Sequence, residues 1–173
     1  MLFQGQYWFY GTHADRVKRL TAEFDGKLRL FSYNHEVYQL APIVGFLYRR
    51  KAEQNRAGGS DTSIFPDQIS NYKDVFQFNY QLIMLLDDGH EASFDVRVDK
   101  AFRFYGTDKA ASDEELYESY VRGGVDVLYE KLIEPSTSKE DYVKNLYEFM
   151  EDFESRYGQN AEEIYDLCRI ARS

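Results

Sequence analysis

The chain has 173 residues, of which 43% are apolar and 17% aromatic, and its formal net charge is −9. The aromatic content excludes a disordered chain, and 11 glycines with 3 prolines exclude a collagen-like or low-complexity one. No apolar run approaches the roughly 18 residues of a membrane span. The single cysteine, Cys168, permits no internal disulfide and is typical of a reducing compartment. We therefore expect a soluble, cytoplasmic protein that folds as one domain over residues 1–173.

The N-terminal segment predicts a helix between short extended stretches. Residues 3–10 are aromatic and short enough for a strand, and residues 27–33 alternate as a strand or an extended connection does. Between them, apolar residues recur at helical spacing from Thr12, a capping residue, to Phe24, and Gly26 ends the run.

The middle of the chain predicts two further helices and a loop. An apolar stripe predicts a helix over residues 35–51, in which Pro42 marks either the first turn or a kink. The polar, glycine-bearing stretch from about 55 to 63 predicts a flexible loop. Pro66 then opens a short helical turn, and a helix follows over residues 72–86.

The last part of the chain predicts helices throughout. Residues 92–105 fit the spacing of a strand and of a helix, and their length favours the helix. Capping residues at Ser112, Thr137 and Asn160 begin three more helices. The sequence thus predicts a mainly α fold, a single-domain bundle of six or seven helices with a minor β-strand pair near the N-terminus.

Charge is unevenly distributed along the chain. Residues 1–56 carry +4, residues 57–106 carry −4 and residues 107–173 carry −9. Two basic clusters in the first part are candidates for contacts with nucleic-acid phosphates: Arg16, Lys18 and Arg19 in the first helix, and Arg49, Arg50 and Lys51 at the end of the second. Cations at a helix C-terminus also complement its dipole, so the second cluster fits a structural role equally well.

A second set of candidates lies in the acidic helices, which are rich in tyrosine. Tyrosine tolerates half-burial and is enriched at interfaces, and adjacent glycines allow backbones to approach closely, within the fold or across an interface. The candidate interface residues are Tyr117, Tyr120, Gly123, Gly124 and Tyr147.

Motifs that carry chemistry are lacking in the sequence. It contains no phosphate-binding loop of the Walker type, no Gly-x-Ser-x-Gly and no pair of cysteines, and its three histidines are scattered. Residues 87–91 (Asp-Asp-Gly-His-Glu) are an acidic turn without the ligand ladder of a calcium loop. We predict no catalytic residues, no cofactor and no metal site.

Two segments together resemble the DndE family, small helical proteins of bacterial DNA sulfur-modification (phosphorothioation) systems. Residues 13–21 followed by 41–47 resemble that family's opening pair of helices. Residues 113–128, with Tyr120-Val-Arg-Gly-Gly-Val-Asp-Val-Leu128, are similar to a later helix, in which Tyr120 stands in place of the family's histidine. The resemblance implies a non-enzymatic accessory protein that self-associates and contacts DNA.

The sequence therefore favours a non-enzymatic accessory or adaptor protein with protein partners in a larger bacterial assembly. The resemblance adds DNA modification or anti-phage defence as the setting. The alternative is a module that binds DNA directly through the basic N-terminal part. Because a basic and an acidic end attract each other between copies, we also expect a homo-oligomer, of which a dimer is the commonest form.

Overall fold

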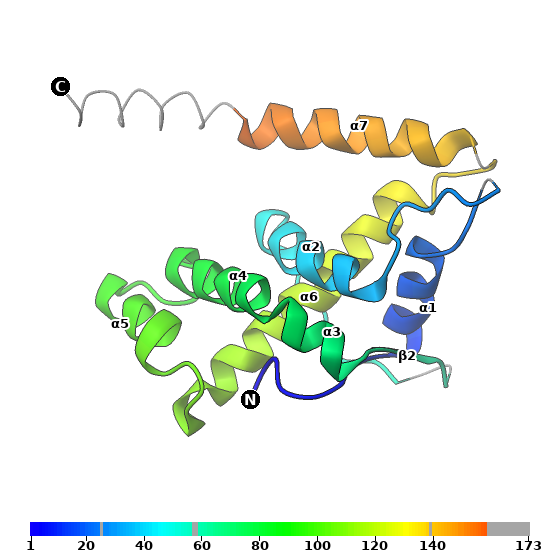
Figure 1. Cartoon of the computed structure of the whole chain (residues 1–173). Coiled ribbons are helices and arrows are strands. Elements are labelled where there is room, and N and C mark those ends of the chain that lie inside the picture. The colour runs from blue at the N-terminus through cyan, green and yellow to red at the C-terminus, as the bar shows by residue number, and fades with distance from the viewer. Residues whose placement is uncertain (25, 57–58, 139, 159–173) are drawn as a thin grey trace. The chain divides into compact units, whose positions relative to one another are not determined.

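The computed structural model describes residues 1–24, 26–56, 59–138 and 140–158, and it is mainly helical (Figure 1). Its elements are, in chain order, β1 (Tyr7–Tyr10), α1 (Gly11–Leu20), α2 (Asn34–Leu47), β2 (Asp61–Ile64), α3 (Pro66–Asn71), α4 (Lys73–Leu86), α5 (Phe94–Val98), the π-helical turn η1 (Asp99–Arg103), the 3-10 turn η2 (Asp108–Ala110), α6 (Ala111–Leu132) and α7 (Glu140–Tyr157). The predicted helical fold with one small strand pair is confirmed.

The chain forms two compact units, an N-terminal unit (Met1–Tyr129) and a C-terminal unit (Glu130–Ser173). Helix α6 begins in the first unit and ends in the second. A single domain over residues 1–173 stays a prediction from the sequence. Among the described residues, no helix is both long enough and apolar enough to cross a membrane.

The strand pair differs from the expected one in its second member. β1 pairs antiparallel with β2, from Tyr7 opposite Ile64 to Tyr10 opposite Asp61, and residues 27–33 stay outside the sheet. Placing 61–63 in a flexible loop was therefore wrong. The amide side chain of Asn34 holds this stretch, since its Nδ2 donates to the Ser63 carbonyl oxygen at 2.9 Å.

Helix boundaries follow backbone packing more closely than the capping patterns. α1 starts at Gly11 rather than after Thr12 and ends at Leu20, well before Gly26. α2 runs through Pro42, which lies inside the helix. Within residues 92–105, which their length predicts as helix, residues 94–103 are helical. Ser112 lies within α6 because the 3-10 turn η2 leads directly into that helix. The helix expected from Asn160 lies outside the described residues.

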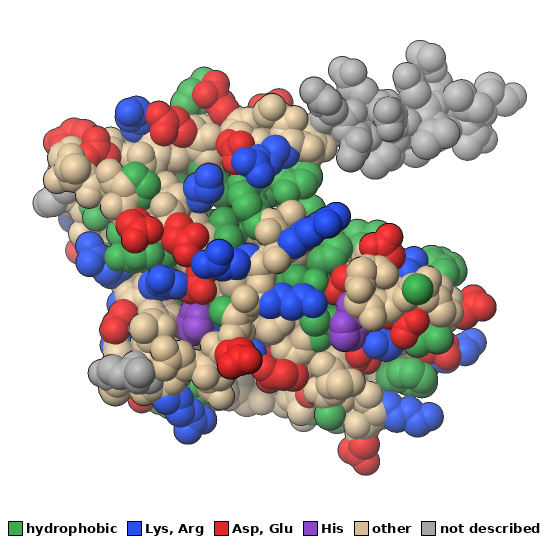
Figure 2. All heavy atoms as spheres, turned by 180° about the vertical axis from the view of Figure 1, so that it is seen from behind, with side chains coloured by type: hydrophobic (Ala, Val, Ile, Leu, Met, Phe, Trp, Pro, Cys, Tyr) green, Lys and Arg blue, Asp and Glu red, His purple; other side chains and the backbone are tan. Residues whose placement is uncertain are grey.

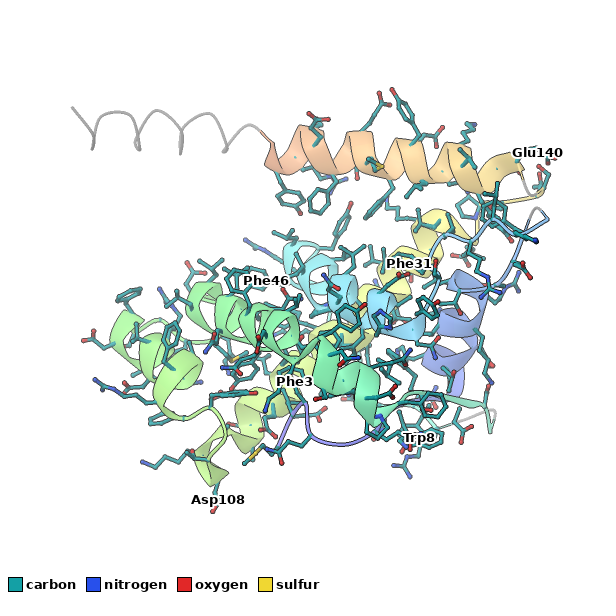
Figure 3. The ribbon with its side chains drawn as sticks, viewed as in Figure 1. Phe3, Trp8, Phe31, Phe46, Asp108 and Glu140 are labelled. Atoms are coloured by element: carbon teal, nitrogen blue, oxygen red, sulfur yellow. The ribbon has the colours of Figure 1, made fainter. Side chains whose placement is uncertain are left out.

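Aromatic side chains fill the core of the N-terminal unit. Phe3, from the N-terminal segment, reaches in among the helices (Figure 3) and packs edge-on against Tyr117, with ring centroids 5.8 Å apart. Tyr38 of α2 meets Phe76 of α4 at 5.0 Å and 90°, and Tyr80 of α4 meets Tyr117 of α6 at 5.6 Å. Edge-to-face pairs of this kind are favourable beyond the area that they bury.

Helices α2 and α6 cross in direct backbone contact. A Cβ built on Gly124 would lie 1.7 Å from the Ala41 carbonyl oxygen, and one built on Gly45 would lie 2.1 Å from that of Tyr120. Only glycine fits at these positions. The Gly123-Gly124 pair thus serves packing within the fold, one of the two roles that the sequence left open.

In the C-terminal unit, side-chain hydrogen bonds cap the start of α7 near Thr137, where the sequence predicts a cap. The acceptor is the carboxylate of Asp141. Asp141 accepts hydrogen bonds from the backbone N–H groups of Thr137 and Ser138, both at 2.8 Å. These bonds hold the pKa of its carboxyl below the usual range. Asn145 then ties α7 to the preceding turn, because its Nδ2 donates to the Ser136 hydroxyl at 2.8 Å.

Candidate functional site

The first basic cluster contacts the protein's own helices. The guanidinium of Arg16 is paired with the carboxylate of Asp126 and lies 5.2 Å from the centre of the Tyr129 ring. Arg19 lies 5.9 Å from the centre of the same ring. Lys18 donates from Nζ to the Ser60 hydroxyl at 2.7 Å. All three cations thus already interact with side chains of the N-terminal unit.

The second basic cluster follows the C-terminus of α2 and is exposed. Arg49 adopts a left-handed backbone conformation with φ of 52°, which ends the helix. Lys51 lies over the Tyr120 ring, with Nζ 4.9 Å from its centre, and Arg50 packs its carbonyl group against Gly123. Figure 2 shows Lys and Arg side chains gathering over the middle of one face of the molecule, interspersed with Asp and Glu.

Two of the candidate interface tyrosines lie in the core. Tyr117 is fully buried and Tyr120 nearly so, and the Tyr120 hydroxyl donates to the Asp87 carboxylate at 2.7 Å. Neither can contact a partner without unfolding, so both interface predictions are wrong. Their helical spacing on α6 is that of a buried face. Tyr147 on α7 is exposed, as an interface residue must be.

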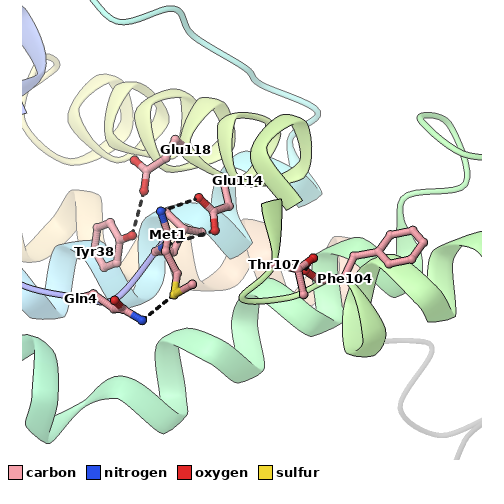
Figure 4. A network of polar contacts seen from close by, with 8 residues as sticks. Met1, Gln4, Tyr38, Phe104, Thr107, Glu114 and Glu118 are labelled. Carbon is pink, nitrogen blue, oxygen red and sulfur yellow. Dashed lines mark hydrogen bonds and ion pairs between the residues drawn. The ribbon is translucent and has the colours of Figure 1, made fainter. Parts of the chain in front are cut away.

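Sequence reasoning missed the most perturbed carboxyl group, that of Glu118 on α6. The Tyr7 hydroxyl donates to its Oε2 at 2.6 Å. The Tyr38 hydroxyl donates to its Oε1 at 2.9 Å, as Figure 4 shows. Burial raises the pKa of Glu118 to about 7, although these two hydrogen bonds and the charge of Arg122 act in the opposite direction. No local pattern identifies this residue, because its partners come from β1 and α2.

Glu118 lies in a polar cleft of about 280 Å³ between β1 and α6. Arg122 also lines the cleft, where its guanidinium pairs with Glu115 and donates to the Ala52 carbonyl oxygen at 2.8 Å. His13, on the same wall, is 3.2 Å from the Asp126 carboxylate. A carboxyl that titrates near neutrality can exchange protons, but here each charged group has a partner within the fold. The cleft is best described as a polar seam that joins β1, α2 and α6.

The acidic turn after α4 also has a structural role. Asp87 accepts the Tyr120 hydroxyl and, at 3.1 Å, the backbone N–H of His90. Within residues 1–24, 26–56, 59–138 and 140–158, no group of three or more His, Cys, Asp or Glu could hold a metal ion. Cys168 lies outside the described residues.

The surface of the N-terminal unit also carries a groove between α2 and α4. Its walls are formed by Glu36, Gln39, Leu40, Ile43 and Asn79, and its volume is about 350 Å³. The side-chain amide of Asn79 crosses its floor and donates to the Gln39 carbonyl oxygen at 2.8 Å. Leu40 is 37% exposed at the rim. We call this feature the α2–α4 groove.

Beside the α2–α4 groove, α4 carries a second apolar stripe in addition to the one it buries. The exposed or half-exposed members are Val75, Phe78, Leu82 and Leu86. They recur every three to four residues and so share one face of the helix. At the end of this stripe, 52% of the surface of Leu86 is exposed. In the sequence, the apolar residues of α2 and α4 cover a wider arc of each helix than one buried face needs. This width was the sequence signal for an exposed apolar surface.

Comparisons with known proteins place this chain in no family. No protein-family model matches it, no curated protein is similar to it, and no solved structure is similar to its fold. The resemblance to the DndE family therefore stays a prediction that depends on the two segments named above.

Proposed function

We propose that this chain is a non-enzymatic helical accessory or adaptor protein, which docks other proteins in a larger cytoplasmic assembly of a bacterium. The observation that carries the proposal is the α2–α4 groove with the apolar stripe beside it. Contiguous exposed apolar surface is uncommon on proteins that act alone, and it commonly marks a protein interface. A groove between two helices is suited to a partner helix that inserts its apolar side chains.

The Glu118 cleft supports the non-enzymatic part of the same proposal. Its ionisable groups are engaged with one another and hold three elements together, which leaves them a structural role. The resemblance to the DndE family adds DNA modification or anti-phage defence as the setting, and the genes beside this one would test that setting directly.

The proposal is tested by recovering partners from the native host with tagged chains. Leu40→Glu introduces a charge at the rim of the α2–α4 groove and keeps a good helix former. Val96→Glu is the matched control, because Val96 on α5 is 36% exposed and undergoes the same change. We expect a partner that wild type and Val96→Glu recover and Leu40→Glu loses. Equal recovery by all three chains would contradict docking in the groove.

The exposed second basic cluster favours direct DNA binding as a second candidate. Arg49, Arg50 and Lys51 are all exposed, as phosphate-contacting residues must be. This candidate predicts binding that weakens steeply with salt and is lost when Arg49 and Arg50 are changed to Glu. Gel shifts with duplex and single-stranded DNA at low salt would decide, and no shift at roughly ten-micromolar protein would eliminate it.

A further inference from the structure

Helix α7 of the C-terminal unit presents an apolar face that is partly exposed. Val143, Leu146, Met150, Phe153 and Tyr157 follow one another at alternating steps of three and four residues. This period is the one by which helices pack along a shared seam. Asn145 and Phe149 form a neighbouring face that is buried, whereas Met150 is 60% exposed. Val143 and Met150 of this set are exposed, and so is Tyr147, which lies one turn from Val143; we call these three residues the α7 stripe.

The α2–α4 groove has a direction, because its two helices run parallel. The His35 and Tyr72 rings stack at 4.3 Å near the start of both helices, and Gln39 meets Asn79 further along. The acidic Glu36 therefore lies at one end of the groove. The exposed Arg49 and Lys51 follow the C-terminus of α2 at the other end.

Helix α7 is acidic, which complements the basic end of the groove. Over residues 140–157 it carries six carboxylates and two cations. A helix laid in the groove in the same direction as α2 brings the exposed Glu151 and Glu154 toward Arg49. Lengths agree as well, since α2 and α4 each extend for about 21 Å and α7 for about 27 Å.

We propose that the α2–α4 groove binds the α7 stripe of a second copy of this chain, so that two copies exchange their α7 helices in a two-fold dimer. This inference rests on the proposed function, because it names the partner of the same groove. Each contact occurs twice in such a dimer, once in each direction, which is the closed arrangement expected of a self-complementary pair.

The test measures the mass of the full-length chain in solution by sedimentation velocity over a micromolar concentration series. Wild type should pass from 20.4 kDa to about 41 kDa as concentration rises. Leu40→Glu and Met150→Glu should each raise the dimer dissociation constant at least about 100-fold, because each dimer loses two buried apolar contacts. The controls Val96→Glu and Ser155→Glu add the same charge away from both surfaces and should dimerise as wild type does.

Mixing the two variants separates α7 exchange from a simple α7–α7 contact. A copy with Leu40→Glu keeps an intact α7 stripe, and a copy with Met150→Glu keeps an intact groove, so their mixture should form a heterodimer that neither forms alone. A wild-type chain that stays at 20.4 kDa, a Leu40→Glu variant that dimerises normally, or a mixture without heterodimer would each overturn the inference. If Leu40→Glu failed to fold by circular dichroism, Val75→Glu in the exposed stripe of α4 beside the groove would replace it.

The two proposals fail in different ways. A monomeric wild type that still recovers a foreign partner through Leu40 would overturn α7 exchange and leave the adaptor function standing. A dimer that depends on Leu40 but recovers no other protein would do the reverse.

Discussion

Replacing Gly124 by alanine should separate α2 from α6 and strongly destabilise the N-terminal unit. The new Cβ would lie 1.7 Å from the Ala41 carbonyl oxygen and 2.5 Å from the carbonyl carbon. Ordinary contact begins near 3.4 Å, so the two backbones must separate by about 1.7 Å. The atoms in the way belong to the backbone of a helix, and no side-chain rotation can relieve the clash.

The magnitude follows from two opposing effects. Alanine favours the helix over glycine by about 1 kcal/mol, which would stabilise the variant if there were room. Overpacking alone typically costs about 1–3 kcal/mol. Separation of the helices also loosens fully buried side chains on both, among them Val44 and Val125, each of which contributes roughly 1.5–3 kcal/mol when buried. We expect a net loss of at least about 3 kcal/mol in the free energy of unfolding.

Urea unfolding followed by circular dichroism measures this loss directly, with Gly89→Ala as the control. At Gly89 the nearest atom to a new Cβ is the Asp87 Oδ1 at 3.7 Å, an ordinary contact, so this change should be nearly neutral. A Gly124→Ala variant within about 0.5 kcal/mol of wild type would refute close backbone packing of α2 on α6, because surface substitutions typically fall in that range.

Three further variants test the polar seam. Because burial raises the pKa of Glu118 to about 7, ionisation of this carboxyl lowers the stability of wild type as pH rises from about 4.5 to 7. Glu118→Gln lacks this group, so in thermal melts it should gain stability relative to wild type over this window. A stability difference between variant and wild type that stays constant with pH would contradict the burial of this carboxyl. Tyr38→Phe removes one hydrogen bond to the carboxylate and should move the midpoint of this pH dependence upward, and an unchanged midpoint would argue against that bond. Asp126→Asn should lower the free energy of unfolding by about 1–3 kcal/mol in urea, because Arg16 and His13 lose the negative charge of their buried partner. A loss no greater than that of the exposed Asp88→Asn would contradict this expectation. The pKa of Asp126 is held below its usual range by these partners, against the effect of burial, so the contribution of Asp126 should disappear only in strong acid.

The helices could be predicted from the sequence because their signals are local. Apolar spacing and Pro66 place α3 and α4 within a residue or two, and the capping pattern at Thr137 places the start of α7. The partner of β1 could not be predicted. Residues 61–64 are polar and short, and they form a strand only because β1 and Asn34 satisfy their backbone groups.

Side-chain roles were harder to predict, because they depend on which face of a helix meets another element. Tyr117 and Tyr120 read as interface residues by composition, yet α2 and α4 cover their face of α6. Glu118 is one position from Tyr117 and looks like a solvated glutamate, until the fold brings Tyr7 and Tyr38 to it. On α2, a single apolar stripe in the sequence proved to be two faces, with Val37 and Val44 buried and Leu40 at the groove rim.

Site-specific photo-crosslinking tests the docking role of the α2–α4 groove most directly. A photoreactive phenylalanine analogue is placed at position 40 and, as the control, at position 96, in an equal mixture of isotopically light and heavy chains. We predict crosslinks from position 40 to peptides that contain residues 143–150, with mixed light–heavy pairs that identify a second copy, and few from position 96. Absence of crosslinks from position 40, or equal yields at both positions, would contradict the account.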